Sequence, residues 1–175
     1  MRLFVAVEIS DELRESLRES MTSLRDCSSL RFVSPENVHV TLKYLGEVQE
    51  AKLHKVKAAL EEVPFSSFRL TSTKYGSFPH VLWLGVKLTK DLAQLQRNVE
   101  RAVRPFALHD PRAYAPHVTL ARFEELTLVE KDVVHALASE RLEVSWHVEG
   151  FVLFKSTLTP DGPVYEAVGR FPTRK

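Results

Sequence analysis

Cysteine is almost absent from this sequence, and so are other features that mark specialised classes of protein. The one cysteine, Cys27, excludes an internal disulfide and a cysteine-based zinc site, and we interpret it as an inert small residue near a helix end. No stretch approaches the roughly 20 apolar residues of a transmembrane helix, and the apolar run 4–7 is too short for a signal-peptide core. We therefore expect a cytoplasmic protein with no membrane partner.

An excess of charge of one sign is missing as well. The formal net charge is +1, from 24 Lys and Arg against 23 Asp and Glu, which argues against a protein that coats long nucleic acids through charge alone. A local basic patch is still compatible with this balance. With 175 residues, 44% of them hydrophobic, the chain fits one compact domain or two small lobes that share a core.

The sequence contains one four-residue motif twice: His-Val-Thr-Leu occurs at 39–42 and again at 117–120. Val and Thr are β-branched and polar and apolar residues alternate, so each copy is typical of a short strand. Alternation places His39 and Thr41 on one side of the first strand, and His117 and Thr119 on one side of the second. Two such strands brought together would line a central cleft.

The two copies lie in similar surroundings. Hydrophobic periodicity and turn residues predict strands at 2–9, 38–45, 68–78, 81–88, 118–123, 144–154 and 164–171, and helices at 11–25, 49–62, 90–104 and 128–142. Ser10 and Thr89 are predicted helix N-caps at matching places in the two halves. We expect one bilobal domain over 1–175, with an internal repeat of about 1–79 and 80–158 and a closing strand at 164–171.

The expected fold class is α+β. In this prediction a pseudo-two-fold axis relates two antiparallel sheets that line the cleft, with helices outside. The two His-Thr strands would then face each other across the axis.

Paired histidines suit phosphodiester cleavage without a metal. One neutral imidazole can deprotonate the nucleophile and one imidazolium can protonate the leaving oxygen, because the histidine pKa lies near neutrality. The threonine hydroxyls can donate hydrogen bonds to the non-bridging phosphate oxygens. A metal site is the rival interpretation, but His-x-Thr offers only one ligand per strand. We interpret the other histidines as solvated or structural: His54, His80, His109, His135 and His147.

These features resemble the 2H phosphoesterase superfamily, whose signature is two His-x-Thr/Ser motifs, each followed by an apolar residue. More narrowly, the chain resembles the RNA 2′,3′-cyclic phosphodiesterases, historically called 2′-5′ RNA ligases. The resemblance runs nearly end to end, through RLFVAVEIS (2–10), ENVHVTLKYLGEV (36–48), FPHVLWLGV (78–86), APHVTLARF (115–123) and KSTLTPDGPVYEAVGRFP (155–172).

The resemblance implies metal-independent hydrolysis of a terminal 2′,3′-cyclic phosphate to a 2′-phosphate, without a cofactor. It makes His39 the general acid and His117 the general base, although the nearly identical motifs leave this order open. It also implies reversible, ATP-independent 2′-5′ ligation of RNA. Arg122 matches a family arginine that would help to hold the phosphate, together with Thr41 and Thr119.

The residue pattern disagrees with one of these implications. An odd offset from His117 puts Arg122 on the opposite side of its strand, so it reaches the site only if the strand ends or bulges near Ala121. Lys43 lies at an even offset from His39, which predicts that it shares the catalytic side and contacts RNA. Further candidates for RNA contact are the flanking aromatic residues Tyr44, Tyr114 and Phe123, whereas Trp83 and Trp146 are predicted to lie in the core.

Two other functions stay open at this stage. One is a phosphodiesterase for a small nucleotide, such as a cyclic phosphate of ADP-ribose or a 2′-5′ oligoadenylate. The other is a non-catalytic protein that binds RNA ends, although such a protein has no need of two proton-transfer groups. The expected partner is thus an RNA with a 2′,3′-cyclic phosphate end or a small cyclic nucleotide, bound by a monomer.

Overall fold

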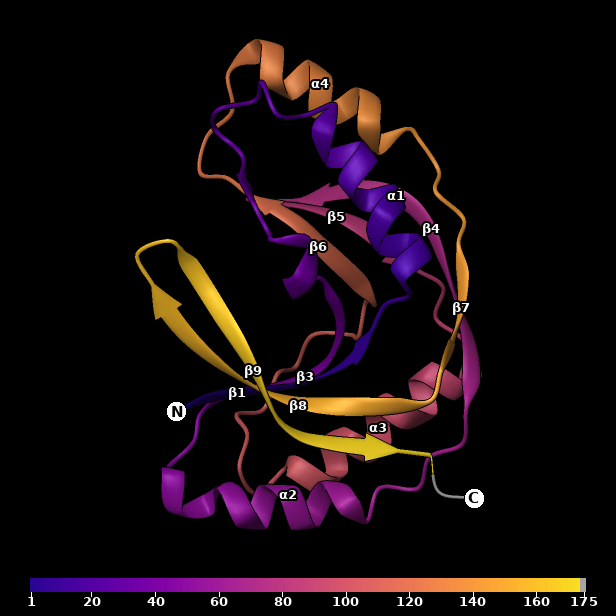
Figure 1. Cartoon of the computed structure of the whole chain (residues 1–175), viewed down its shortest axis with the longest axis vertical. Helices are drawn as coiled ribbons and strands as arrows, with labels where there is room; N and C mark the ends of the chain where they lie inside the picture. The colour runs from indigo at the N-terminus through magenta and orange to yellow at the C-terminus, as the bar shows by residue number, and fades with distance from the viewer. Residues whose placement is uncertain (174–175) are drawn as a thin grey trace.

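Two antiparallel sheets face each other in the computed structural model, which describes residues 1–173 (Figure 1). The first sheet has the strand order β3-β1-β8-β9 and the second has the order β2-β6-β5-β4-β7. The strands of the first sheet are β1 (Arg2–Glu8), β3 (His39–Glu47), β8 (Gly150–Thr159) and β9 (Gly162–Pro172). Those of the second are β2 (Arg31–Phe32), β4 (Phe68–Phe78), β5 (Val81–Val86), β6 (His117–Arg122) and β7 (Ser145–Val148).

The helices cover the outer sides of the sheets. In Figure 1, α1 and α4 lie along the second sheet, and α2 and α3 lie beneath the first. This arrangement confirms the predicted α+β class with helices outside the sheets. The helices are α1 (Asp11–Thr22), α2 (Leu53–Glu61), α3 (Lys90–Val103) and α4 (Leu128–Ala138), with 3₁₀ turns η1 (Pro35–Asn37) and η2 (Glu50–Lys52).

Both predicted N-caps are present. The hydroxyl of Ser10 accepts from the backbone N–H of Leu13 at 3.2 Å, and that of Thr89 accepts from Leu92 at 3.2 Å. Each cap satisfies one of the backbone donors that a helix start leaves without a partner. Helix α4 begins with a full capping box at Thr127, which the sequence analysis did not identify.

The sheets do not follow the two halves of the sequence. Strands β2 and β4 of the first half belong to the second sheet, and β8 of the second half belongs to the first sheet. Helix α1 follows a strand of the first sheet but packs against the second sheet, where its Ser20 hydroxyl lies 2.5 Å from the Tyr75 hydroxyl on β4. The two lobes therefore share a continuous core.

The prediction of a single strand at 144–154 is wrong. The chain forms β7 and β8 there, in different sheets, with a break at Glu149. At Gly150 the backbone of β9 comes so close that a Cβ would lie 2.9 Å from the carbonyl oxygen of Phe171. Strand β2 was not predicted, and α1 and α4 end before the predicted boundaries of 25 and 142. Within residues 1–173, no helix is long and apolar enough to cross a membrane.

Candidate active site

The two histidines of the repeated motif are held in the same way. Each is the first residue of its strand, His39 of β3 and His117 of β6. Nδ1 of His39 lies 2.6 Å from the carbonyl oxygen of Asn37, and Nδ1 of His117 lies 2.7 Å from that of Ala115. A carbonyl oxygen only accepts, so Nδ1 donates in both rings and Nε2 is the nitrogen left for chemistry.

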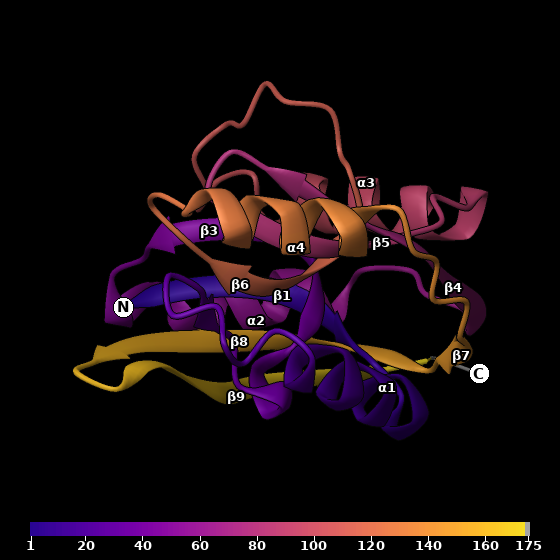
Figure 2. The same ribbon diagram turned by 90° about the horizontal axis from the view of Figure 1, so that it is seen from above.

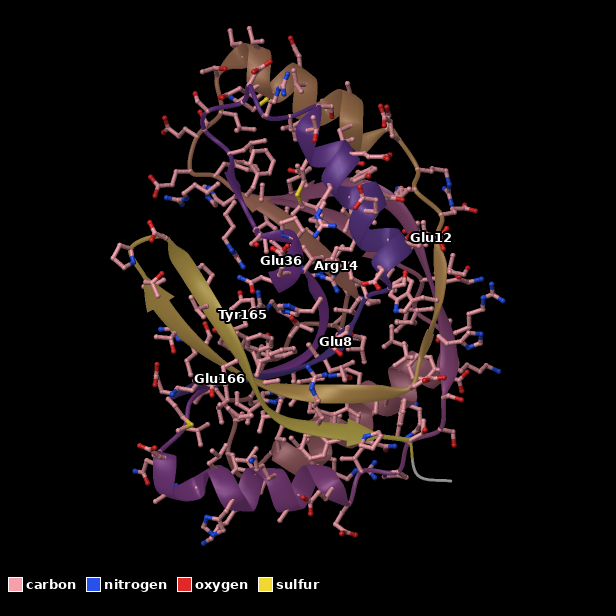
Figure 3. The ribbon with its side chains drawn as sticks, viewed as in Figure 1. Glu8, Glu12, Arg14, Glu36, Tyr165 and Glu166 are labelled. Atoms are coloured by element: carbon pink, nitrogen blue, oxygen red, sulfur yellow. The ribbon has the colours of Figure 1, made fainter. Side chains whose placement is uncertain are left out.

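The turn before His39 is itself braced by α1. Arg14 Nη1 donates to the carbonyl oxygen of Pro35 at 2.6 Å, and Arg18 donates to Glu36 at 3.1 Å. Figure 3 shows Arg14 and Glu36 beside each other above the first sheet. These contacts hold η1, whose Asn37 carbonyl orients the imidazole of His39. In many catalytic histidines, a hydrogen bond from one ring nitrogen to a carbonyl oxygen orients the other ring nitrogen in the same way.

His39 lies in an aromatic setting. Its ring stacks on Phe4 at 4.8 Å between centroids and meets Tyr165 edge-on at 5.4 Å, with Phe154 at 5.9 Å. Burial lowers the pKa of His39 to about 4; the hydrogen bond to Asn37 opposes this shift and the charge of His117 adds to it. In the free protein His39 is therefore neutral at pH 7, and the two imidazoles are close enough to interact.

His117 also has aromatic neighbours, Phe78 edge-on at 5.3 Å and Trp83 at 6.4 Å. The prediction that Trp83 belongs to the core is wrong, because it lies directly opposite Thr119 and on the same side of the sheet. Gly76 makes room for its ring, since a Cβ there would lie 2.2 Å from Trp83. Trp146 is buried as predicted.

A β-bulge in β3 reverses the alternation after Thr41. Thr41 lies opposite Ala6 and Lys43 opposite Val5, so Leu42 is the extra residue. The bulge turns Lys43 toward the core and returns Tyr44 to the side of His39 and Thr41. The prediction that Lys43 shares this side is therefore wrong, whereas Tyr44 lies there with 51% of its surface exposed.

The second motif carries the same bulge. Thr119 lies opposite Trp83 and Ala121 opposite Leu82, which leaves Leu120 as the extra residue. This is the bulge on which the placement of Arg122 depended. Arg122 thus lies on the side of His117 and Thr119 and is exposed.

Arg122 interacts electrostatically with Tyr165 on β9, a strand of the first sheet. Burial raises the pKa of the Tyr165 hydroxyl, and the positive charge of Arg122 opposes this rise, so the guanidinium lies close enough to act on that hydroxyl. In Figure 3, Tyr165 lies on the stretch of β9 that faces the second sheet. The histidine face, as we call this region, consists of Phe4, His39, Thr41, Tyr44, Phe78, Trp83, His117, Thr119, Arg122, Phe154 and Tyr165.

Lys43 takes part in a buried polar network behind the bulge. Its side chain is only 8% exposed, and Nζ lies 3.0 Å from Oε1 of Glu100 on α3. This hydrogen bond lowers the pKa of the Glu100 carboxyl. Gln96 donates to Glu100 at 3.3 Å and to the carbonyl oxygen of the bulged Leu42 at 3.4 Å. The network thus joins α3 to the strand that carries His39 and Thr41.

We expect Glu100→Ala to lower the free energy of unfolding by about 2 kcal/mol, because it leaves the Lys43 ammonium buried without its partner. Lys43→Met is the matched control and should cost less than about 1 kcal/mol, since Glu100 is 36% exposed and can be hydrated. Urea unfolding at pH 7 measures both values. A larger loss for Lys43→Met than for Glu100→Ala would contradict this account.

The remaining candidates differ in accessibility. Tyr114 is mostly buried, which raises the pKa of its phenol, and its hydroxyl donates to the carbonyl oxygen of Thr41 at 2.8 Å. This bond ties segment 104–116, which arches away from the sheets, back to β3 (Figure 2). Phe123 packs against the core and lies 6.3 Å from the ring of His80. Neither ring lies as open as that of Tyr44.

Sequence reasoning missed Phe4, Phe154 and Tyr165 as neighbours of His39. Tyr165 lies in the last stretch that carries the family resemblance, but no periodicity in that stretch places it beside a histidine far away in the chain. Among residues 1–173, no three His, Cys, Asp or Glu side chains come together in a way that could hold a metal ion.

The comparisons with known proteins agree with this geometry. The sequence model of the 2′-5′ RNA ligase superfamily matches residues 4–159. Proteins named RNA 2′,3′-cyclic phosphodiesterase from Archaeoglobus fulgidus and Thermus thermophilus are each 34% identical to this chain; they cover 95% and 99% of it, and 97% and 91% of their own lengths.

Solved structures share the whole fold. The crystal structures of TT0787 of Thermus thermophilus and of E. coli LigT complexed with 3′-AMP are 27% and 25% identical to this chain, with TM-scores of 0.83 and 0.84. Each covers 99% of this chain and 98% of its own. The chain belongs to the 2′-5′ RNA ligase superfamily, with the 2H phosphoesterase fold.

Proposed function

We propose that this protein hydrolyses the terminal 2′,3′-cyclic phosphate of RNA to a 2′-phosphate, without a metal ion. The observation that carries the proposal is the matched pair of histidines, each with Nδ1 engaged by a carbonyl and Nε2 free. Relatives of 34% identity that span nearly the whole chain carry the name of this activity. Two proton-transfer groups in equivalent settings suit a displacement at phosphorus.

The proton balance of the reaction needs both rings. Water attacks the phosphorus and loses a proton to Nε2 of His117, while the bond from phosphorus to the 3′ oxygen breaks. That oxygen takes a proton from Nε2 of His39, and exchange with solvent restores both rings. His39 is neutral in the free protein, so in this scheme the anionic phosphate has to stabilise its protonated form.

The phosphate oxygens would be bound by three further residues. The hydroxyls of Thr41 and Thr119 lie two residues from the histidines on the same side of each strand. Arg122 adds a guanidinium that can bind two phosphate oxygens at once. These donors would stabilise the charge that develops on the phosphate as the nucleophile attacks.

The same site would also allow 2′-5′ ligation. When the 5′ hydroxyl of a second RNA replaces water, breakage of the same bond to the 3′ oxygen leaves a 2′-5′ linkage and needs no ATP. A small nucleotide is the second candidate substrate, because E. coli LigT, of the same fold, has been crystallised with 3′-AMP.

The test is to incubate a short RNA ending in a 2′,3′-cyclic phosphate with the protein in EDTA and to identify the product by phosphorus NMR. We expect a 2′-phosphate as the only product, with a rate that EDTA does not change. A 3′-phosphate product would contradict the proposed bond cleavage, and loss of activity in EDTA would support the metal-dependent rival. No reaction with RNA but turnover of ADP-ribose cyclic phosphate would favour the small-nucleotide substrate.

A further inference from the structure

A second arginine lies directly opposite Arg122. The two-residue strand β2 pairs with β6 so that Arg31 faces Arg122 and Phe32 faces Ala121. Residues directly opposite each other in an antiparallel pair point to the same side of the sheet. Arg31 therefore lies on the side of the histidine face, at the edge of the second sheet, and sequence reasoning did not single it out.

The backbone holds Arg31 in a defined place. Beyond the pair itself, the N–H of Val33 donates to the carbonyl oxygen of the bulged Leu120 at 2.8 Å. Two residues before Arg31, the backbone N–H of Ser29 donates to Oε1 of Glu130 at 3.0 Å. The bulge that turns Arg122 toward the histidines thus also anchors the strand that carries Arg31.

Two like charges at directly opposite positions destabilise a strand pair. In the part of the chain that the structure describes, Arg31 has one weak ion pair: its Nη2 lies 3.7 Å from Oε1 of Glu124, with the two side chains 70% and 84% exposed. Exposed ion pairs of this kind contribute little. Within residues 1–173, Arg122 forms no ion pair with a carboxylate. A bound anion would relieve the repulsion between the two guanidinium groups.

We propose that Arg31 binds the phosphodiester on the 5′ side of the terminal nucleotide, so that the protein prefers an RNA end to a free cyclic mononucleotide. This inference rests on the proposed function, which places the cyclic phosphate at the histidines, the threonines and Arg122. The next phosphate of an RNA lies one nucleotide farther from the reacting bond. Arg31 lies one strand farther from His117, at the sheet edge, and a guanidinium can bind a phosphate through two parallel hydrogen bonds.

The test compares adenylyl-adenosine 2′,3′-cyclic phosphate, which has one internal phosphodiester, with adenosine 2′,3′-cyclic phosphate, which has none. We expect Arg31→Met to lower kcat/KM about tenfold on the dinucleotide and to leave the mononucleotide unchanged. Glu124→Gln, which frees Arg31 from its competing carboxylate, should raise kcat/KM on the dinucleotide alone. Arg69→Met removes an exposed charge where β4 pairs with β7 and should change neither substrate.

A dinucleotide with a neutral methylphosphonate linkage separates charge from contact area. The wild type should hydrolyse it as slowly as Arg31→Met hydrolyses the natural dinucleotide, and Arg31→Met should not distinguish the two linkages. Equal losses on the mononucleotide and the dinucleotide would overturn the inference, and so would no loss on either.

Binding distinguishes failure of the inference from failure of the proposed function. If the wild type hydrolyses neither substrate, the proposed function fails. Calorimetric titration with 2′-AMP and with adenylyl-adenosine 2′-phosphate then still measures the contribution of Arg31, because it needs no turnover. An equal affinity ratio for wild type and Arg31→Met would overturn the inference.

Discussion

Replacing either His39 or His117 by alanine is expected to lower kcat on an RNA 2′,3′-cyclic phosphate by about 10²–10⁴-fold, the usual contribution of a positioned acid or base. Each substitution removes one of the two imidazoles of the histidine face, and no other histidine within residues 1–173 lies on that face. The fold should survive, because both side chains sit at the first residue of a strand and lie outside the hydrophobic core.

The double variant should lose little more than the slower single variant, because groups that act in one reaction cycle are not additive. His54→Ala is the matched control, since His54 is exposed on α2. Steady-state kinetics and circular dichroism on the four variants and the wild type measure activity and folding. A single variant that keeps within tenfold of wild-type activity would show that its histidine does not transfer a proton.

A substrate with a sulfur leaving group distinguishes which of the two imidazoles is the general acid. When the 3′ oxygen of the cyclic phosphate is replaced by sulfur, the leaving thiolate needs little protonation. If His39 is the general acid, His39→Ala should recover most of its rate on this substrate, while His117→Ala stays slow. The reverse pattern would exchange the two roles.

The second large effect concerns stability at low pH. Burial lowers the pKa of His39 from 6.5 to about 4, so between these values the unfolded chain binds a proton at this position that the folded protein does not. The contribution of neutral His39 to the free energy of unfolding is fully present above pH 6.5 and is lost as the pH falls through about 4. The shift corresponds to a loss of at most about 3 kcal/mol in the free energy of unfolding.

Urea unfolding of wild type and His39→Gln at pH 7 and pH 4 measures this contribution. The wild type should lose more stability than the variant between the two values, by up to about 3 kcal/mol. Carboxyl groups with lowered pKa values, such as those of Glu36 and Glu130, titrate in both proteins and cancel in the comparison. Identical pH dependence in the two proteins would show that His39 is not desolvated.

Much of the site's chemistry was predictable from neighbouring residues. Alternation in His-Val-Thr-Leu put histidine and threonine on one side of each strand, and the pairing of Thr41 with Ala6 and of Thr119 with Trp83 agrees with this. The N-caps at Ser10 and Thr89 follow the same kind of rule. The catalytic roles and the internal repeat of about 1–79 and 80–158 stay predictions.

The errors have a common origin in strand pairing. Alternation assumes an uninterrupted strand, so it placed Lys43 on the catalytic side and Arg122 on the other. One extra residue in each strand exchanged both assignments. Trp83 was assigned to the core because its segment is apolar, but Gly76 on the neighbouring strand gives its ring a place beside His117.

The sequence by itself determined most strands and helices, the starts of α1, α3 and α4, and the sides on which the two His-Thr pairs lie, whereas the helix predicted from 49 begins as the 3₁₀ turn η2 and becomes α-helical only at Leu53. These features depend on residues within one strand or one helical turn. Only the tertiary structure decided that the two motifs meet, that Arg122 joins them while Lys43 leaves, and that Arg31 lies opposite Arg122. The physical reason is that bulges and sheet order are set by hydrogen bonds and packing between strands far apart in the chain.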